Sequence, residues 1–238
     1  MRHSPRLSSE NEETGENELN ITVPYNLIQI VGPIDLEMTQ RVTGELLAYD
    51  CQNQMMGVDQ PIHLLINSVG GDVAAAWQIC DIMDCVKSPV YTIGTGNLAS
   101  AAVIIFITGE NGHRLLSHHC SVMCHQYSWG IEGKYNELKA VKGEVDNIYK
   151  RMEDHFHERT GIEKDIIKNE LLGNTDKWLT ARQAKKFGIT DKVIKFSKTY
   201  PFHIVPSLRP ETQRKKILEL QKQEEEEYER LRQQEHGE

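Results

Sequence analysis

The sequence predicts an α/β fold in which helices cover a largely parallel sheet. In the first half of the chain, short apolar runs typical of buried strands alternate with segments whose apolar residues recur at helical spacing. Strands that alternate with helices pair in parallel, because each helix carries the chain back to the same end of the sheet. The length of 238 residues suits one large domain, and the mean hydropathy of −0.51 indicates that part of the chain lies outside a packed core.

The elements of the first half follow one another in this order. Helical spacing over residues 35–50 predicts a helix after the first strand. A second helix is predicted to begin after Asp72, a residue type that commonly caps helix N-termini. A small apolar helix starts at about Ser100, after a Gly-Thr-Gly-Asn turn. The predicted strands lie at 27–31, 62–66 and 90–93.

A long charged helix over residues 135–159 dominates the second half. Its apolar residues are three or four positions apart, which gives a narrow stripe of the kind that packs against another helix. We therefore expect a protruding arm. The stripe consists of Leu138, Val141, Val145, Ile148, Met152 and Phe156. The shorter elements are strands at 114–116, 121–124 and 192–194, and helices at 163–172 and 181–187.

Charge and hydropathy argue against several classes of protein. Of the net charge of −8, the first twenty residues carry −3 and residues 207–238 carry −2. The part of the chain between them is therefore close to neutral, whereas a nucleic-acid-binding face would be strongly basic. The longest apolar run, 99–108, is shorter than the roughly 20 residues that cross a bilayer. Residues 1–19 are predicted to be disordered and contain no apolar stretch that would act as a secretory signal. The charged segment 207–238 is predicted to be a solvated helix or a disordered tail.

Cysteine usage indicates a reducing compartment. The chain has five cysteines, and an odd number without a signal peptide suggests free thiols in a cytoplasmic protein. Cys120, Cys124 and His125 have a C-x3-C-H spacing that matches no common zinc site. Alternation along a strand would place both cysteines on one buried face, so we expect neither a metal nor a cofactor.

Three features could carry chemistry, and each has a simpler structural explanation. Gly70-Gly71 could direct backbone N–H groups into a cavity, or could form an ordinary turn before a helix. Ser100, between a strand and a helix, could be an exposed nucleophile or a helix cap. His125 follows a β-type run and could be a general base or a hydrogen-bonded structural residue.

Taken together, these motifs resemble the proteolytic subunit of the Clp protease. INSVGGDV, GNLASA and MCHQ follow one another as in that family, and VGPID, DIMDCVKSPVYTI, HERTG and DKWLTARQAKKFGITDKVI continue the likeness over residues 27–196. The resemblance implies a crotonase-like α/β spiral at about 20–200 with a protruding strand–helix handle at about 126–160. It also implies two stacked seven-membered rings that enclose a chamber, and an ATP-driven Clp unfoldase as partner. The implied activity is that of an ATP-dependent serine endopeptidase that acts on unfolded polypeptides.

The resemblance assigns roles to individual residues. The nucleophile falls on Ser100, the general base on His125 and the third member of the triad on Asp176, in TDKWLTA. The oxyanion donors fall on the backbone N–H groups of Gly71 and Ala101. This chemistry needs no metal or cofactor.

The chain also departs from the family pattern, which leaves two alternatives open. Around the site, the residues that differ from the family pattern are Val69, Leu98, Ala101 and Ala102. At the positions where the family has aromatic residues that dock the unfoldase, this chain has His63, Leu65 and Cys85. Residues 1–26 do not match the family's axial loop, which suggests a divergent paralogue or a phage-encoded relative in the host cytoplasm. One alternative is a catalytically silent ring subunit or assembly scaffold. The other is a crotonase-type acyl-CoA hydratase or isomerase.

Overall fold

A computed structural model describes residues 26–128, 130, 132 and 134–195 of the chain. The two predicted tails, 1–19 and 207–238, lie outside these residues. In the described part of the chain, no helix combines the length and the apolar character needed to cross a membrane.

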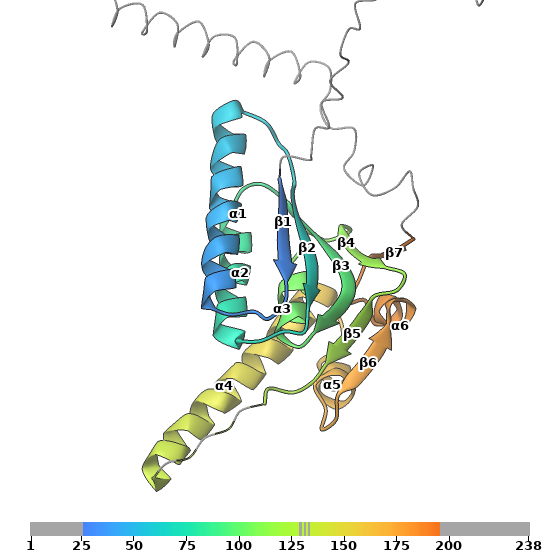
Figure 1. Ribbon diagram of the computed structural model, residues 1–238. Helices are drawn as coiled ribbons and strands as arrows, with labels where there is room; N and C mark the ends of the chain where they lie inside the picture. Colours follow the sequence, from blue (N-terminus) through green and yellow to red (C-terminus); the bar gives the residue numbers. More distant parts are fainter. Residues whose placement is uncertain (1–25, 129, 131, 133, 196–238) are drawn as a thin grey trace, which may run out of the picture.

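A mixed, mainly parallel sheet forms the centre of the fold (Figure 1). Within the described residues it has seven strands, and β1, β2, β3, β4 and β7 pair in that order, all in parallel. Strand β5 pairs in parallel with β3 and antiparallel with β6. The predicted α/β class with a parallel sheet is therefore confirmed. The strands are β1 (Leu27–Val31), β2 (Ile62–Ser68), β3 (Val90–Ala99), β4 (Arg114–Ser117), β5 (Ser121–Cys124), β6 (Lys177–Thr180) and β7 (Lys192–Ile194).

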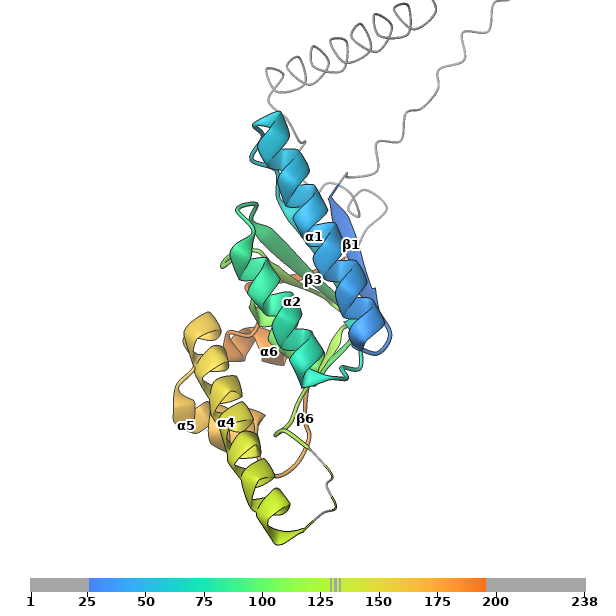
Figure 2. The same cartoon turned by 90° about the vertical axis from the view of Figure 1, so that its left-hand side faces the viewer.

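Helices α1 (Leu36–Met56) and α2 (Val73–Cys85) lie side by side over one face of the sheet (Figure 2). Asp72 caps α2 as predicted, because its side chain accepts the N–H of Ala75 at 2.8 Å. Helix α1 runs six residues beyond the predicted end and stops at Gly57, which takes the left-handed conformation that ends helices.

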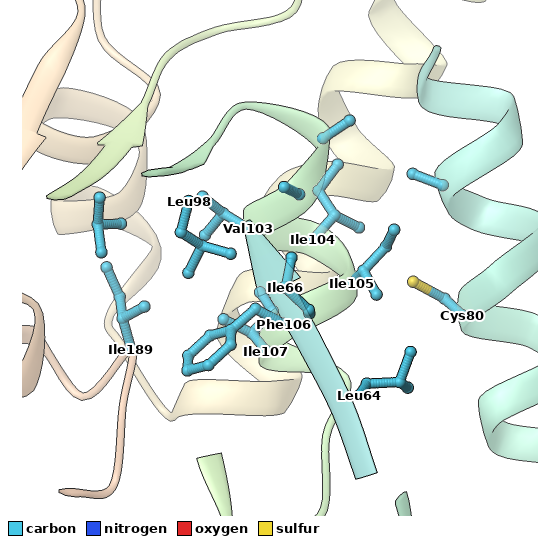
Figure 3. Close-up of a cluster of buried hydrophobic side chains, with 14 of the residues drawn as sticks. Leu64, Ile66, Cys80, Leu98, Val103, Ile104, Ile105, Phe106, Ile107 and Ile189 are labelled. Atoms are coloured by element: carbon cyan, nitrogen blue, oxygen red, sulfur yellow. The ribbon is translucent and has the colours of Figure 1, made fainter. Parts of the chain in front are cut away.

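The core is centred on α3 (Ala101–Ile107), a helix that is apolar on all sides and completely buried. Figure 3 shows its side chains packed between Leu64 and Ile66 of β2, Leu98 of β3 and Cys80 of α2. Since Ser100 directly precedes this helix, the best-packed part of the protein fixes the position of that residue.

Strand β3 differs from the prediction in a way that affects the site. The Gly94–Asn97 segment, expected as a turn, remains in the strand, which continues to Ala99. Its first half pairs with β4 and its second half with β5, and the change of partner occurs around Gly96. Gly96 has φ +59°, and the Asn67 side chain accepts the N–H of Asn97 beside it. This bend carries the chain from the centre of the sheet to Ser100.

Helix α4 (Tyr135–Thr160) matches the predicted arm closely, and its N-terminal half extends away from the sheet (Figure 1). Met152 and Phe156 of the apolar stripe are buried within the chain, whereas Leu138 is 39% exposed. An ion pair between Arg159 and Asp84 joins the C-terminal end of α4 to α2. Val141 and Val145 are half-buried, so the described residues of the chain itself cover the outer part of the stripe only in part.

The C-terminal region differs from the prediction in two elements. The single helix predicted at 163–172 is a short α5 (Lys164–Ile166) followed by a π-helical turn at Ile167–Leu171. Strand β6 was not predicted, because its four residues form a strand only by pairing with β5. Helix α6 (Ala181–Phe187) and β7 lie where the sequence predicts them.

Candidate active site

Ser100 occupies a strained turn between β3 and α3. Its φ of 55° is the only positive value at a non-glycine residue in the described part of the chain. Its backbone N–H donates to the carbonyl oxygen of Met123 on β5 at 2.9 Å, and its carbonyl oxygen accepts from the N–H of Val103 at 2.9 Å. The side chain makes no capping hydrogen bond, so its hydroxyl does not have the simpler role of a helix cap.

The glycine pair at the end of β2 lets this turn approach the sheet closely. Gly70 has φ +91°, and a Cβ there would lie 2.7 Å from both the Ala99 carbonyl oxygen and the Ser100 Cβ. Gly71 has φ +152°, and a Cβ there would lie 2.2 Å from the Ile34 carbonyl oxygen. Only glycine fits either position, so the pair is more than an ordinary turn.

Two backbone N–H groups beside Ser100 have no acceptor among the described residues. The backbone hydrogen bonds on either side of Gly71 do not include its N–H, because the Ile34 N–H donates to the Gly70 carbonyl and the Ile34 carbonyl accepts from the Asp72 N–H. Ala101 is the first residue of α3, so its N–H has no carbonyl one turn earlier in the helix. Both residues line the same cleft as Ser100, where their amides could donate to an oxyanion.

His125 lies directly after β5, and its Nε2 is 2.7 Å from the Ser100 Oγ. The parallel pairing of β5 with β3, in register at Ala99 and Met123, brings the two residues together across 25 positions of sequence. The hydrogen-bonding partner of this histidine is therefore the candidate nucleophile itself.

Asp176 lies immediately before β6, at the same edge of the sheet. Antiparallel pairing matches Cys124 with Lys177, and the same register carried one residue further sets His125 opposite Asp176. The Asp176 side chain is exposed, and no hydrogen bond within the described residues joins it to His125. Catalytic hydrogen bonds are often unformed in an enzyme without substrate, so the role of Asp176 stays a prediction.

The cleft that contains these groups has a volume of about 610 Å³. Its size lies within the range of ligand-binding clefts. The walls come from the N-terminal half of α2, the start of α3, the segment after β5 and the middle of α4. Besides the candidate site residues, they include Trp77, Ile104, Tyr127, Ile148, Arg151 and Met152.

The sequence did not single out the residues of α2 and α4 that form this cleft. Trp77 lies one helical turn after Val73 and could have been noticed by that spacing. Met152 was predicted to belong to the arm stripe, but it also lines the cleft.

The cysteines near the site are buried, as the strand alternation predicts. Cys120 and Cys124 are each 2% exposed, and burial raises the pKa of both thiols to about 12. Both therefore stay protonated at neutral pH, in a form that is neither a good nucleophile nor a metal ligand.

Comparisons with known proteins agree with this geometry. The family model described as Clp protease matches residues 11–197. A protein of Ostreococcus tauri described as an ATP-dependent Clp protease proteolytic subunit is 34% identical over 160 residues, which cover 67% of this chain and 77% of that protein. With a match of this extent, and with Ser100 and His125 in contact where the motifs predict, the chain belongs to the Clp protease family.

Proposed function

We propose that the protein is a serine endopeptidase of the Clp type, which cleaves peptide bonds in unfolded polypeptides. The observation that carries the proposal is the 2.7 Å contact between Ser100 Oγ and His125 Nε2, next to two backbone amides without acceptors. A serine hydroxyl becomes a useful nucleophile when a base within hydrogen-bond distance can take its proton.

The mechanism follows from these positions. Ser100 Oγ attacks the scissile carbonyl carbon and transfers its proton to His125 Nε2. The N–H groups of Gly71 and Ala101 donate to the resulting oxyanion, and each such donor contributes roughly 3–4 kcal/mol. His125 then protonates the leaving amine as the C–N bond breaks. Water, deprotonated by the same histidine, hydrolyses the acyl-enzyme and restores Ser100.

Asp176 is assigned to orient the imidazole by accepting its Nδ1–H. The β5–β6 register supports this role, because it directs both residues to one edge of the sheet. The role requires the carboxylate, which is exposed, to come within hydrogen-bond distance of His125 when substrate binds or when subunits assemble. The same position is also what a catalytically silent ring subunit would show, so the proposal needs a direct test of activity.

Assembly into rings is part of the proposal. The outer stripe of α4, with Leu138 39% exposed, needs an apolar partner that its own described residues do not supply. We assign that partner to another subunit, in two stacked heptameric rings by likeness to the family. The Ostreococcus tauri relative is described as the subunit of an ATP-dependent protease, which supports an ATP-driven unfoldase as the partner of this chain too.

Labelling with an active-serine phosphonate, together with hydrolysis of a fluorogenic peptide, tests the activity. We expect Ser100 to be labelled, and Ser100→Ala to lose about 10⁶-fold in turnover while its assembly by sedimentation is unchanged. His125→Ala should be nearly as impaired and the double variant no worse, because the two residues act as one unit. The matched control is Ser121→Ala, at an exposed serine on β5, which should keep normal activity. A Ser100→Ala protein with a tenth of its activity would contradict the mechanism, and an unlabelled wild-type protein would favour the silent subunit or the hydratase.

A further inference from the structure

The face of the sheet that is turned away from α1 and α2 carries an apolar cluster of its own. Its members are Leu65 of β2, Ile93 of β3, Leu115 of β4 and Ile194 of β7, and they form a group separate from the main core. Leu65 follows Leu64, which packs into the main core, so alternation along the strand directs Leu65 to the opposite face. Register then aligns Leu65 with Ile93 and Ile93 with Leu115. We call these four residues the outer-face cluster.

A second layer must cover this cluster, and the described helices do not provide it. Ile93, Leu115 and Ile194 are only 7–8% exposed, yet no residue of a described helix belongs to the cluster. The buried apolar residues of those helices belong instead to the main core on the other face. Since an apolar sheet face is buried by packing another element on it, the covering layer comes from residues outside the described part of the chain or from another molecule.

A buried polar atom on the same face calls for a cover that has hydrogen-bonding groups. His63 lies two residues before Leu65 on β2 and is 3% exposed. Its ring meets Tyr91 edge to face, with ring centres 5.5 Å apart, and Tyr91 stacks in turn on His113. The Nε2 atom of His63 has no hydrogen-bond partner among the described residues. A buried nitrogen without a partner is costly, so a polar group of the covering layer beside it would stabilise the fold.

The residues that follow β7 are the part of the chain best placed to cover this face. Strand β7 is the last in the order of the sheet, and the described chain ends at Lys195, directly after Ile194 of the outer-face cluster (Figure 1). Tyr200 is six residues beyond Ile194, and an extended chain of that length reaches about 20 Å. The three strand spacings from β7 to β2 amount to about 14 Å, so the segment can span the whole cluster.

The other end of the described chain is less suitable. Strand β1 contributes no residue to the outer-face cluster, and the residue that it pairs with Leu65 is the polar Gln29. Residues that precede β1 would therefore have to cross two strands before they met Ile93.

The sequence after β7 has the character of an apolar cover. Residues 200–206 read YPFHIVP, in which Tyr200, Phe202 and Ile204 occupy alternate positions. A residue before a proline favours the extended conformation, and both Tyr200 and Val205 precede prolines. In an extended chain alternate side chains point to the same side, so Tyr200, Phe202 and Ile204 would form one apolar row and His203 would point away from it.

We propose that residues 200–205 fold back over the outer face of their own sheet, with Phe202 and Ile204 against the outer-face cluster. The backbone groups of this segment supply the polar partner that His63 Nε2 lacks among the described residues. Because the segment is tethered to β7, it is present at this face at high effective concentration. Another molecule that binds the face must displace the segment first, so its affinity falls with the fraction of molecules in which the face is uncovered.

Photo-crosslinking in the full-length protein tests which segment covers the cluster. The photoreactive residue p-benzoylphenylalanine replaces Phe202, and mass spectrometry locates the crosslinks. We expect them in peptides that contain Leu65, Ile93 or Leu115 of the same chain. The matched control carries the photoreactive residue at His203, which the alternation directs away from the sheet, and it should give far fewer of these crosslinks. Assembling ordinary and isotopically labelled chains together separates crosslinks within a chain from those between chains.

Thiol labelling then measures how well the segment protects the face. In a Leu65→Cys background, the rate of reaction with a maleimide is followed on the peptide that contains position 65, which separates it from the exposed Cys51 and Cys85. Adding Phe202→Asp should raise this rate by about tenfold or more, the change in an equilibrium that follows the loss of one buried phenylalanine side chain. Adding His203→Asp introduces the same charge one position further on and should leave the rate close to that of the background.

Each contrary result identifies a different error. Crosslinks from position 202 to another chain would overturn the proposal and make a second copy of the protein the cover. Crosslinks to the residues before β1, or equal yields from positions 202 and 203, would show that this segment does not pack on the cluster as described. An unchanged labelling rate in Phe202→Asp would overturn the proposal as well. None of the cluster residues lines the active-site cleft, so these results do not depend on peptidase activity, and their failure would leave the proposed function intact.

Discussion

Replacing Gly70 with alanine is a direct test of how the glycine pair positions the nucleophile. The added Cβ would lie 2.7 Å from the Ser100 Cβ and from the Ala99 carbonyl oxygen, and 3.0 Å from the Ala101 nitrogen. Ordinary van der Waals contact begins at 3.4 Å, so the two atoms at 2.7 Å must move away by about 0.7 Å and the Ala101 nitrogen by about 0.4 Å. The displaced atoms belong to the candidate nucleophile and to one candidate oxyanion donor, and a misplacement approaching 1 Å can cost about 10²-fold in rate. We therefore expect Gly70→Ala to lose about 10²-fold in kcat/KM for peptide hydrolysis.

Gly112→Ala separates this displacement from backbone strain. Gly112 has φ +86°, close to the +91° of Gly70, but a Cβ there would meet nothing within 4 Å. Both variants should lose roughly 1–2 kcal/mol of stability from the left-handed conformation, and Gly70→Ala roughly 1–3 kcal/mol more from its close contacts, as measured by denaturant unfolding. Only Gly70→Ala should also lose peptidase activity and react more slowly with the active-serine phosphonate. If its activity is within a factor of about two or three of that of Gly112→Ala, the glycine pair does not position Ser100 as argued.

Two further predictions concern assembly and pH. Replacing Leu138 and Val145 together with Asp should place unpaired charges in the ring interface at a cost of several kcal/mol, and so give smaller particles by sedimentation. Lys139→Asp, on the same helix but off the stripe, should stay assembled, and an intact double variant would show that the stripe has no partner subunit. Burial, and secondarily repulsion from His113, lowers the pKa of His63 to about 4. The unfolded chain therefore binds a proton at His63 more tightly than the folded protein does. The free energy of unfolding should therefore carry no penalty from His63 above pH 6.5 and should fall by at most about 3 kcal/mol as the pH drops to 4. In denaturant unfolding, His63→Phe should show a weaker dependence of this free energy on pH. An unchanged slope in His63→Phe would assign the loss to other groups, such as His155, whose pKa burial also lowers.

Local chemistry accounts for what could be predicted. Period-two and period-3.6 patterns identify the strands and helices, and Asp72 marks the start of α2 because its carboxylate can satisfy a free N–H. The glycines, Ser100 and His125 stand out because their types match the ends of strands and helices where they occur. Each of these signals acts over a few residues and can be read without knowing the rest of the fold.

Contacts between distant segments decided the rest. Strand β3 continues through Gly94 and Gly96 because β4 and then β5 supply its hydrogen-bonding partners, a pairing that no local pattern specifies. The cleft exists because α2, α3 and α4 converge beside Ser100, and local sequence patterns do not specify how these helices pack together. The sequence by itself determined which residue types are available for the chemistry. Only the tertiary structure decided that Ser100 and His125 touch, because the register of β3 against β5 sets the distance between their side chains. The structure alone also shows that Asp176, just before β6, is exposed although the β5–β6 register places it opposite His125.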